Sequence, residues 1–336
     1  MAADQTAAAR RTISLDPQPR VGTLGSDSMA TAEHINEKVS SLRRTLGMYR
    51  LMRILSEGAT GVVLEAEHWT LGRRVALKTF NPRGFERTGL RVAELTEIFL
   101  HEARILGAID HANVVTIYDA GFARGTEMSV EIPYLALRLV ANGDLSVLVQ
   151  QRGRVDGDAA LRLLTGCTHG LRAIHAAGFL HRDLKPANVL VEVDSTPRIS
   201  DLSAAAPKGM PPSPGRVVGT CGYLAPEHVI HGVSNVATDL YALGATMYYA
   251  LTAKPPYQVE PHDLVTWAEN ATAAPAPHLE NPAVDARLAQ VVMRLLSPDP
   301  QQRYASCDEV AEDCENLRAG RPITRAARSR TSFFWR

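Results

Sequence analysis

The run His181-Arg182-Asp183-Leu184-Lys185-Pro186-Ala187-Asn188 carries more chemical information than any other part of this chain. Asp183 offers a carboxylate that can orient an acceptor hydroxyl and take its proton. Asn188 offers a neutral carbonyl oxygen suited to a hard cation such as Mg²⁺, and Lys185 supplies a point charge that can reach a phosphate. A histidine and an aspartate in a polar loop can also form an ordinary hydrogen-bonded turn, so these two residues alone do not indicate a function. The full run of eight residues predicts a loop that catalyses phosphoryl transfer.

A glycine-containing turn lies upstream, in Leu55-Ser56-Glu57-Gly58-Ala59-Thr60-Gly61-Val62-Val63, between two alternating apolar stretches. The pattern predicts a strand, a turn and a strand, and glycines let a backbone approach phosphates closely. A plain β-hairpin is the alternative. Val75-Ala76-Leu77-Lys78 follows on a third predicted strand, where Lys78 is either a phosphate ligand or a solvated edge lysine.

These segments together resemble the eukaryotic-type protein kinases, in particular the bacterial eukaryotic-like (Hanks-type) serine/threonine kinases, and Lys185 is typical of the serine/threonine branch. The resemblance implies an α+β, two-lobed fold with a small β-rich N-lobe, which contains one long helix, and a larger, mainly helical C-lobe. It also implies that Lys78 touches the α- and β-phosphates of ATP and is held by a glutamate from the next helix.

The helix that would supply this glutamate is predicted over residues 92–107 from its apolar period. Three of its glutamates are candidates. We prefer Glu102 to Glu94 and Glu97, because Glu102 precedes a segment that resembles the junction between this helix and the fourth strand of the family.

A second metal ligand is expected in Pro197-Arg198-Ile199-Ser200-Asp201-Leu202-Ser203, which occupies the place of the family's Asp-Phe-Gly motif. Asp201 would bridge the phosphates through Mg²⁺, with Mn²⁺ as a possible substitute. Two positions depart from the family's glycines. Ser56 is expected to crowd the glycine loop and weaken nucleotide binding, and Ser203 is expected to be strained in a backbone conformation that glycine reaches freely.

The segment Gly219-Thr220-Cys221-Gly222-Tyr223-Leu224-Ala225-Pro226-Glu227 resembles the end of a kinase activation segment. The resemblance implies that Thr220 lines the acceptor site and that Glu227 pairs with a late arginine, Arg303. Asp239 would brace the catalytic loop, although an ordinary acid at a helix start is the alternative.

The adenine pocket is placed by the resemblance at residues 134–145, where an apolar strand runs into a glycine-containing link. The backbone groups of Arg138 and Val140 would meet adenine. Arg138 replaces a common glutamate, and its side chain is expected to face away without consequence. Asp144 either contacts the ribose or caps a helix. The residues assigned to ATP are Ser56, Gly58, Gly61, Val63, Ala76, Lys78, Leu137, Arg138, Val140, Asp144 and Leu190.

The 336 residues, 45% of them apolar, are enough to bury a large core. We expect a mobile N-terminal leader over residues 1–47 and a kinase domain over 48–318. Within that domain the N-lobe covers about 48–138, the hinge about 138–143 and the C-lobe about 144–318. A basic and aromatic tail fills 319–336; it is either solvated or in weak contact with an anionic surface.

Charge and cysteine content narrow the setting of the protein. The formal net charge is zero, so the chain has no overall positive potential that would attract nucleic acid. The four cysteines have no metal-like spacing and are expected to be reduced thiols. With no apolar signal core and no stretch long enough to span a bilayer, the sequence predicts a cytoplasmic protein.

Three functions remain open from the sequence. The first is an ATP- and Mg²⁺-dependent serine/threonine protein kinase that acts on protein substrates, with Asp183, Lys185, Lys78 and Glu102 as catalytic residues and with Asn188 and Asp201 as metal ligands. The second is a nucleotide-binding scaffold without activity, motivated by Ser56 and Ser203. The third is a small-molecule phosphotransferase of kinase-like fold.

Overall fold

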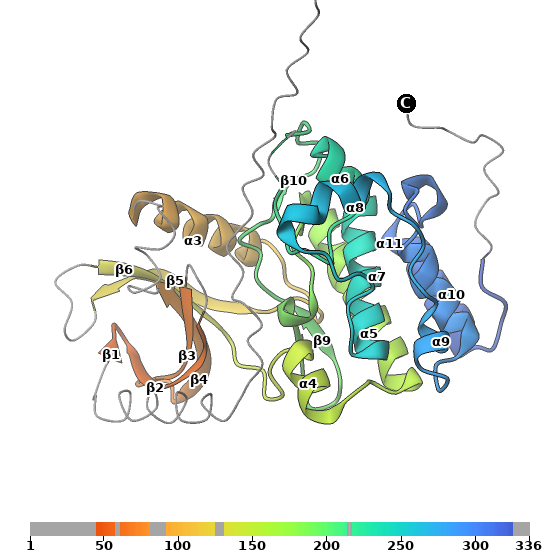
Figure 1. Cartoon of the computed structure of the whole chain (residues 1–336). Coiled ribbons are helices and arrows are strands. Elements are labelled where there is room, and N and C mark those ends of the chain that lie inside the picture. Colours follow the sequence, from red (N-terminus) through yellow and green to blue (C-terminus); the bar gives the residue numbers. More distant parts are fainter. Residues whose placement is uncertain are drawn as a thin grey trace, which may run out of the picture.

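A curled sheet with one long helix forms the N-lobe of the computed structural model, which describes residues 45–57, 61–80, 92–124, 131–213, 215 and 217–324 (Figure 1). The sheet is antiparallel, and its six strands follow the order β1-β2-β3-β4-β6-β5. Helix α3 packs against β5 and β6. The elements are β1 (Thr45–Leu46), β2 (Tyr49–Glu57), β3 (Gly61–His68), β4 (Arg73–Phe80), α3 (Val92–Gly107), β5 (Ile117–Arg124) and β6 (Glu131–Arg138).

The curl of this sheet brings β2 close to β5, the last strand in the order. The hydroxyls of Tyr49 and Tyr134 both donate to Asp119 Oδ2, at 3.1 and 2.8 Å. Burial, followed by the Asp119 hydrogen bond, raises the pKa of Tyr134 to about 12. A small apolar core fills the curl and consists of Leu46, Tyr49, Ala66, Val75, Leu77, Ala123 and Ala136.

The leader predicted through residue 47 is too long. Thr45 and Leu46 form β1, which pairs with β2, and Leu46 is buried in the core of the sheet. An apolar side chain in a paired strand stabilises the lobe by its removal from water, so these residues belong to the folded domain. Residues 1–44 and 325–336, and with them most of the predicted leader and tail, lie outside the described residues.

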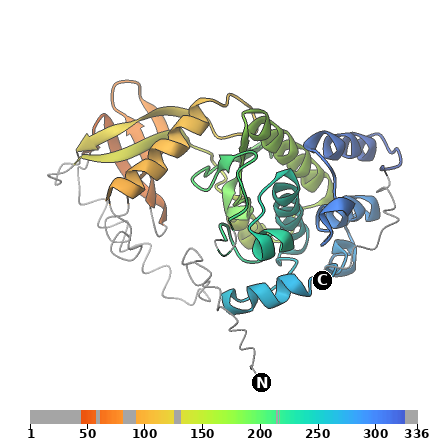
Figure 2. The ribbon, with the colours of Figure 1, turned by 90° about the horizontal axis from the view of Figure 1, so that it is seen from above.

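The C-lobe is built around helices α5 and α7, which pack against each other (Figures 1 and 2). Helix α7 starts at a capping box of Asn235 and Thr238, which satisfies two backbone donors of its first turn. Nearly all of its side chains are buried, so α7 lies in the core of the lobe. The helices of this lobe are α4 (Leu145–Arg152), α5 (Gly157–Ala176), α6 (Pro226–His231), α7 (Val236–Thr252), α8 (Leu264–Glu269), α9 (Pro277–Glu280), α10 (Ala286–Leu295) and α11 (Cys307–Arg318).

Four short strands of the C-lobe flank the predicted catalytic loop and the segment that contains Asp201. They are β7 (Phe179–Leu180), β8 (Val189–Val191), β9 (Pro197–Ile199) and β10 (Ala206–Pro207), paired as β8 with β9 and β7 with β10. Helix α5 approaches β9 very closely at Gly166, where an added Cβ would lie 2.4 Å from Pro197 Cγ. The absence of a side chain there lets the hairpin of β8 and β9 sit directly on the core of the lobe.

All four cysteines are free thiols, and Cys167, Cys307 and Cys314 are buried. In the part of the chain that is described, no helix is long and apolar enough to cross a membrane.

Candidate active site

The catalytic loop between β7 and β8 is held from below by helix α7. Asp239 accepts the backbone N–H of His181 at 2.8 Å and that of Arg182 at 2.9 Å. His175 Nε2 lies 2.8 Å from the same carboxylate. Burial alone would raise the pKa of Asp239, but the His175 contact and these donors lower it, which keeps the carboxylate ionised. The predicted brace is confirmed, and His175 is a supporting residue that the sequence pattern did not single out.

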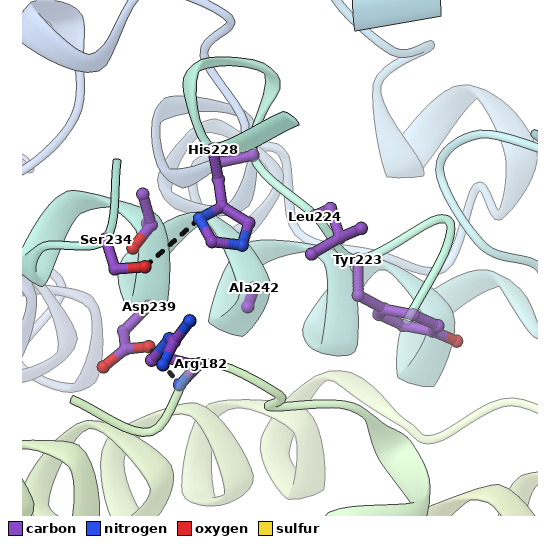
Figure 3. A pocket seen from close by; sticks show the side chains of 9 residues that line it. Arg182, Tyr223, Leu224, His228, Ser234, Asp239 and Ala242 are labelled. Carbon is purple, nitrogen blue, oxygen red and sulfur yellow. Dashed lines mark hydrogen bonds between the residues drawn. The ribbon is translucent and has the colours of Figure 1, made fainter. Parts of the chain in front are cut away.

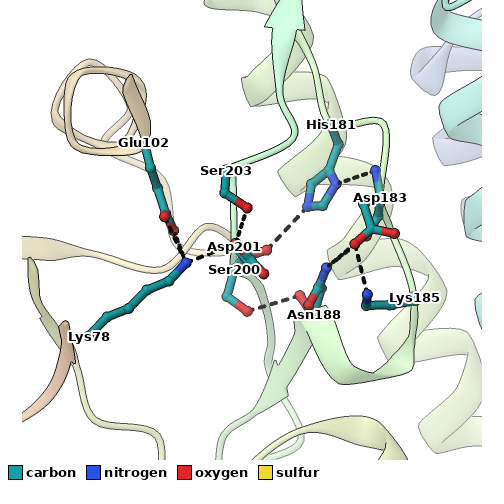
Figure 4. Close-up of polar contacts among 9 residues, drawn as sticks. All are labelled: Lys78, Glu102, His181, Asp183, Lys185, Asn188, Ser200, Asp201 and Ser203. Carbon is teal, nitrogen blue, oxygen red and sulfur yellow. Dashed lines mark hydrogen bonds and ion pairs between the residues drawn. The ribbon is translucent and has the colours of Figure 1, made fainter. Parts of the chain in front are cut away.

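Asp183 lies in a triangle with Lys185 and Thr220 (Figure 4 shows the Lys185 side). Lys185 Nζ is 2.8 Å from Asp183 Oδ2 and 2.7 Å from Thr220 Oγ1. The Thr220 hydroxyl donates to Asp183 Oδ1 at 2.7 Å. On the other side, Asn188 Nδ2 donates to the backbone oxygen of Asp183 at 2.7 Å. The structure therefore gathers the base candidate, the lysine and the amide around one point.

Lys78 meets two carboxylates where the N-lobe faces the C-lobe (Figure 4). Its Nζ lies 2.7 Å from Glu102 Oε2 and 2.9 Å from Asp201 Oδ1. Burial alone would lower the pKa of Lys78, but the charges of Asp201 and Glu102 outweigh it and raise the pKa. The lysine is thus a fixed cation rather than a solvated edge residue, and Glu102 is the helix glutamate that reaches it.

Asp201, and not Ser203, adopts the unusual backbone conformation of this motif. Asp201 has a φ of 59°, whereas Ser203 is not among the residues with positive φ, so the strain predicted for Ser203 is wrong. The Ser203 hydroxyl instead donates to Asp201 Oδ1 at 2.7 Å. Lys78, this hydroxyl and Lys185 together lower the pKa of Asp201 against the opposing effect of burial. Serine at this position adds a donor that glycine does not have.

Four apolar residues assigned to ATP belong to the large apolar core of the molecule or border it. Ala76 and Leu137 are buried members that pair across β4 and β6, and Val63 and Leu190 pack against this core. Val140, in the link after β6, is also buried. A flat apolar ring would fit between such side chains.

The ends of the glycine turn are described, and its middle is not. Ser56 lies exposed in β2 and pairs with Val63, and Gly61 begins β3. Gly58 lies outside the described residues. The predicted effect of Ser56 on nucleotide binding stays a prediction.

Two polar residues, one in the predicted hinge and one directly after it, have partners of their own. Asp144 caps helix α4, since its Oδ1 accepts the N–H groups of Ser146 and Val147 at 2.9 and 3.1 Å. The Nε atom of Arg138 lies 2.7 Å from Glu192 Oε1, so this side chain has a partner within the chain; the neutral effect expected of the arginine stays a prediction. Of the two alternatives for Asp144, the structure shows the cap.

The end of the activation segment, which we take as residues 201–227, passes directly over the catalytic loop. Gly219 has a φ of 128°, and an added Cβ would lie 2.9 Å from the Arg182 carbonyl oxygen and 2.6 Å from Leu224 Cδ2. Only glycine fits there without displacing a neighbour. The predicted pair of Glu227 and Arg303 forms, at 2.6 Å.

A small hollow lies behind this segment, lined in part by Arg182, Leu224, His228 and Asp239 (Figure 3). His228 is buried there, with Nδ1 2.7 Å from the Val233 oxygen and Nε2 3.0 Å from the Val218 oxygen. Burial lowers its pKa. None of its lining residues is assigned to the ATP site, and Tyr223, Leu224 and Ala225 of the activation segment form part of its wall.

The donor set fits a divalent cation that shares its ligands with phosphates. Asp201 carries a depressed pKa, and Asn188 turns its amide nitrogen toward Asp183, which directs its carbonyl oxygen away. Both are hard oxygen donors. Among the residues that the structure describes, no cluster of three or more His, Cys, Asp or Glu could hold a metal ion alone. Asn188 and Asp201 supply two hard oxygen donors, and phosphate and water oxygens would complete the coordination of such an ion.

Comparison with known families agrees with this arrangement. The sequence model of the protein kinase domain family matches residues 49–314 of this chain. The chain belongs to this family. The predicted two-lobed fold is thereby confirmed, and family membership implies ATP and a divalent metal ion.

Bacterial relatives are similar over most of this chain. A probable serine/threonine-protein kinase of Streptomyces coelicolor is 29% identical over 286 residues, which is 84% of this chain and 41% of the relative. Serine/threonine-protein kinase PknA of Mycobacterium tuberculosis is 31% identical over 279 residues, 82% of this chain and 62% of the relative. Serine/threonine-protein kinase PknE of Mycobacterium bovis is 31% identical over 267 residues, which is 79% of this chain and 45% of the relative. The chain thus spans about half the length of these relatives.

Proposed function

We propose that this chain is an ATP-dependent serine/threonine protein kinase, which transfers the γ-phosphate of ATP to serine and threonine hydroxyls of proteins. The observation that carries this proposal is the contact of a hydroxyl, that of Thr220, with Asp183 Oδ1 at 2.7 Å. A substrate hydroxyl that took the same position would be oriented by Asp183 and would lose its proton to it. Lys185, 2.8 Å from this carboxylate, would then face the transferred phosphate.

ATP would lie between the lobes. Lys78, held by Glu102, would neutralise charge on the α- and β-phosphates; its contacts with Glu102 and Asp201, which keep the amine charged, support this role. The apolar side chains of Val63, Ala76, Leu137 and Leu190 would enclose adenine, and the backbone of the hinge at Arg138 and Val140 would supply its hydrogen bonds.

Asn188 and Asp201 would hold Mg²⁺, for which Mn²⁺ can substitute. The bound ion would neutralise charge on the phosphates and orient them. Ser203 and Lys78 hold the Oδ1 atom of Asp201, so they fix the direction in which its other oxygen points. The cytoplasmic location, the end of the domain at residue 318 and the contact of the tail with an anionic surface stay predictions from the sequence.

The test is transfer of labelled γ-phosphate from ATP to a generic basic protein in the presence of Mg²⁺, followed by phosphoamino-acid analysis. We expect phosphoserine and phosphothreonine, and none with Asp183→Asn. Nucleotide binding without transfer would instead favour the inactive scaffold, and transfer to small molecules but not to protein would favour the third alternative. Either result would overturn the proposal.

A further inference from the structure

Glu192 joins two arginines at the rear of the predicted ATP site. Its Oε1 atom accepts from Arg138 Nε at 2.7 Å and from Arg198 Nε at 2.8 Å. The side chain of Glu192 is 16% exposed and that of Arg198 13%, while that of Arg138 is 41% exposed. One carboxylate therefore binds two guanidinium groups, and the net charge of +1 that remains is the more exposed Arg138's to share with solvent, since Arg198 and Glu192 are largely buried.

The three residues come from the two walls of one pocket. Arg138 is the last residue of β6, and its backbone begins the hinge. Glu192 directly follows β8, the strand that carries Leu190, and Arg198 lies in the paired strand β9. The ion pair of Arg138 with Glu192 thus spans the hinge and the strand that would form the floor of the adenine pocket.

Backbone contacts fasten the rest of the hinge to the same strand. The Val191 N–H donates to the Gly143 oxygen at 2.9 Å, and Asn142 Nδ2 donates to the Glu192 oxygen at 3.1 Å. Asp144 and Leu190 form an isolated β-bridge. Arg138 is the end of this series on the N-lobe side, so the loss of its contact would let the hinge move away from the floor of the pocket.

We infer that Arg138, Glu192 and Arg198 form a positioning cluster, which sets the distance between the hinge backbone and Leu190 and thereby the affinity of the site for adenine nucleotides. The inference rests on the proposed function, because it takes the adenine to lie between these two walls. The side chains act through the backbone and not by contact with the nucleotide.

The substitution Arg138→Glu gives a sharp test, since glutamate is the residue that the kinase resemblance leads one to expect at this position. Here it would face Glu192, and two carboxylates in contact repel. We expect ADP binding, measured by calorimetry with Mg²⁺, to weaken about tenfold, which corresponds to about 1.4 kcal/mol. Arg138→Lys keeps the charge and should stay within roughly threefold of the wild type.

The matched control is Arg124→Glu. Arg124 ends the neighbouring strand β5 and lies 3.7 Å from Glu131, in an exposed pair (69% and 57%) within the same hairpin. This variant undergoes the same charge reversal away from the pocket, so we expect unchanged ADP binding.

Hydrogen exchange of the Val191 amide supplies a reading that needs no nucleotide. We expect faster exchange in Arg138→Glu than in the wild type and in Arg124→Glu, because the Val191 amide bonds to the hinge. Wild-type exchange of Val191 or wild-type ADP binding in Arg138→Glu would each overturn the inference. A wild-type chain that binds no ADP would instead refute the proposed function, and the affinity inference with it.

Discussion

Glu227 and Arg303 face each other as a doubly hydrogen-bonded ion pair, with Nη1 2.6 Å from Oε1 and Nη2 2.9 Å from Oε2. The Arg303 side chain is fully buried, and its guanidinium also donates to the Ser297, Ala237 and Pro298 oxygens. The pair thus anchors the end of the activation segment to the core of the C-lobe.

Removal of one partner of this pair should be costly. Arg303→Met leaves the Glu227 carboxylate without its cation, and we expect the free energy of unfolding, measured with urea, to fall by about 3–5 kcal/mol. Arg50→Met removes the exposed arginine of the Arg50–Glu67 pair and should cost less than about 1 kcal/mol. Equal losses of unfolding free energy in the two variants would show that the buried pair stabilises the fold no more than the exposed pair does.

Lys78→Met and Asp183→Asn should each abolish most phosphotransfer without unfolding the chain, because both groups act on the transition state. For the general base, a loss of roughly 10²–10⁴-fold is expected. Initial rates on a basic protein, beside circular dichroism of each variant, measure this. A folded variant that keeps a rate within about tenfold of the wild type would disprove the role given to that residue.

Ser203→Gly should raise the Mg²⁺ concentration needed for half-maximal activity. The change removes the donor to Asp201 Oδ1 and loosens the backbone next to it. We expect an increase of roughly three- to tenfold, on the scale of one hydrogen bond to a charged group. Ser203→Thr keeps the hydroxyl and should resemble the wild type; an Mg²⁺ requirement unaltered by glycine would show that the hydroxyl does not orient Asp201.

Ser213 is expected to accept phosphate from the chain itself. It is exposed, and it lies in the proline-rich stretch Pro211-Pro212-Ser213-Pro214 of the activation segment. A phosphate there could pair with Arg182. Mass spectrometry after incubation with ATP should find phosphate on Ser213, and Ser213→Ala should lower the transfer rate. An unmodified Ser213 and an unchanged rate would mean that the segment is set without modification.

His228 should make stability depend on pH. Burial lowers its pKa in the folded chain, so below about pH 6.5 the unfolded chain binds a proton that the folded chain does not. The contribution of neutral His228 to the free energy of unfolding is therefore fully present above that pH and is lost as the pH falls. Urea unfolding at pH 7 and pH 5 should show a smaller loss in His228→Gln than in the wild type, while His262→Gln, at an exposed position, should keep the wild-type loss.

The sequence predicted those parts of the site whose chemistry is written in contiguous motifs. The helix of residues 92–107 followed from its apolar period, whereas the catalytic loop and the choice of Glu102 followed from residue runs that resemble the kinase family, and the structure places Glu102 beside Lys78. The pair of Glu227 and Arg303 also followed from the motifs, although the two residues are 76 positions apart.

Contacts that depend on the path of the backbone could not be predicted in this way. The sequence showed Arg138 as a departure from a common glutamate, but its partner Glu192 lies 54 positions away in no recognisable motif. Ser203 was expected to carry strain, since a motif does not tell which of its residues takes the positive φ. The shared contact of Tyr49 and Tyr134 with Asp119 likewise depends on the curl of the sheet.

Gly219 has a consequence for anyone who would alter the acceptor preference of this protein. Its missing side chain lets the peptide next to Thr220 lie against the Arg182 carbonyl. In a library that randomises residues 217–224, active clones should therefore return glycine at 219 almost without exception, whereas the half-buried Cys221 should vary. Substitutions meant to change the acceptor preference should therefore be made after residue 219, because Gly219 sets how closely the chain approaches Asp183.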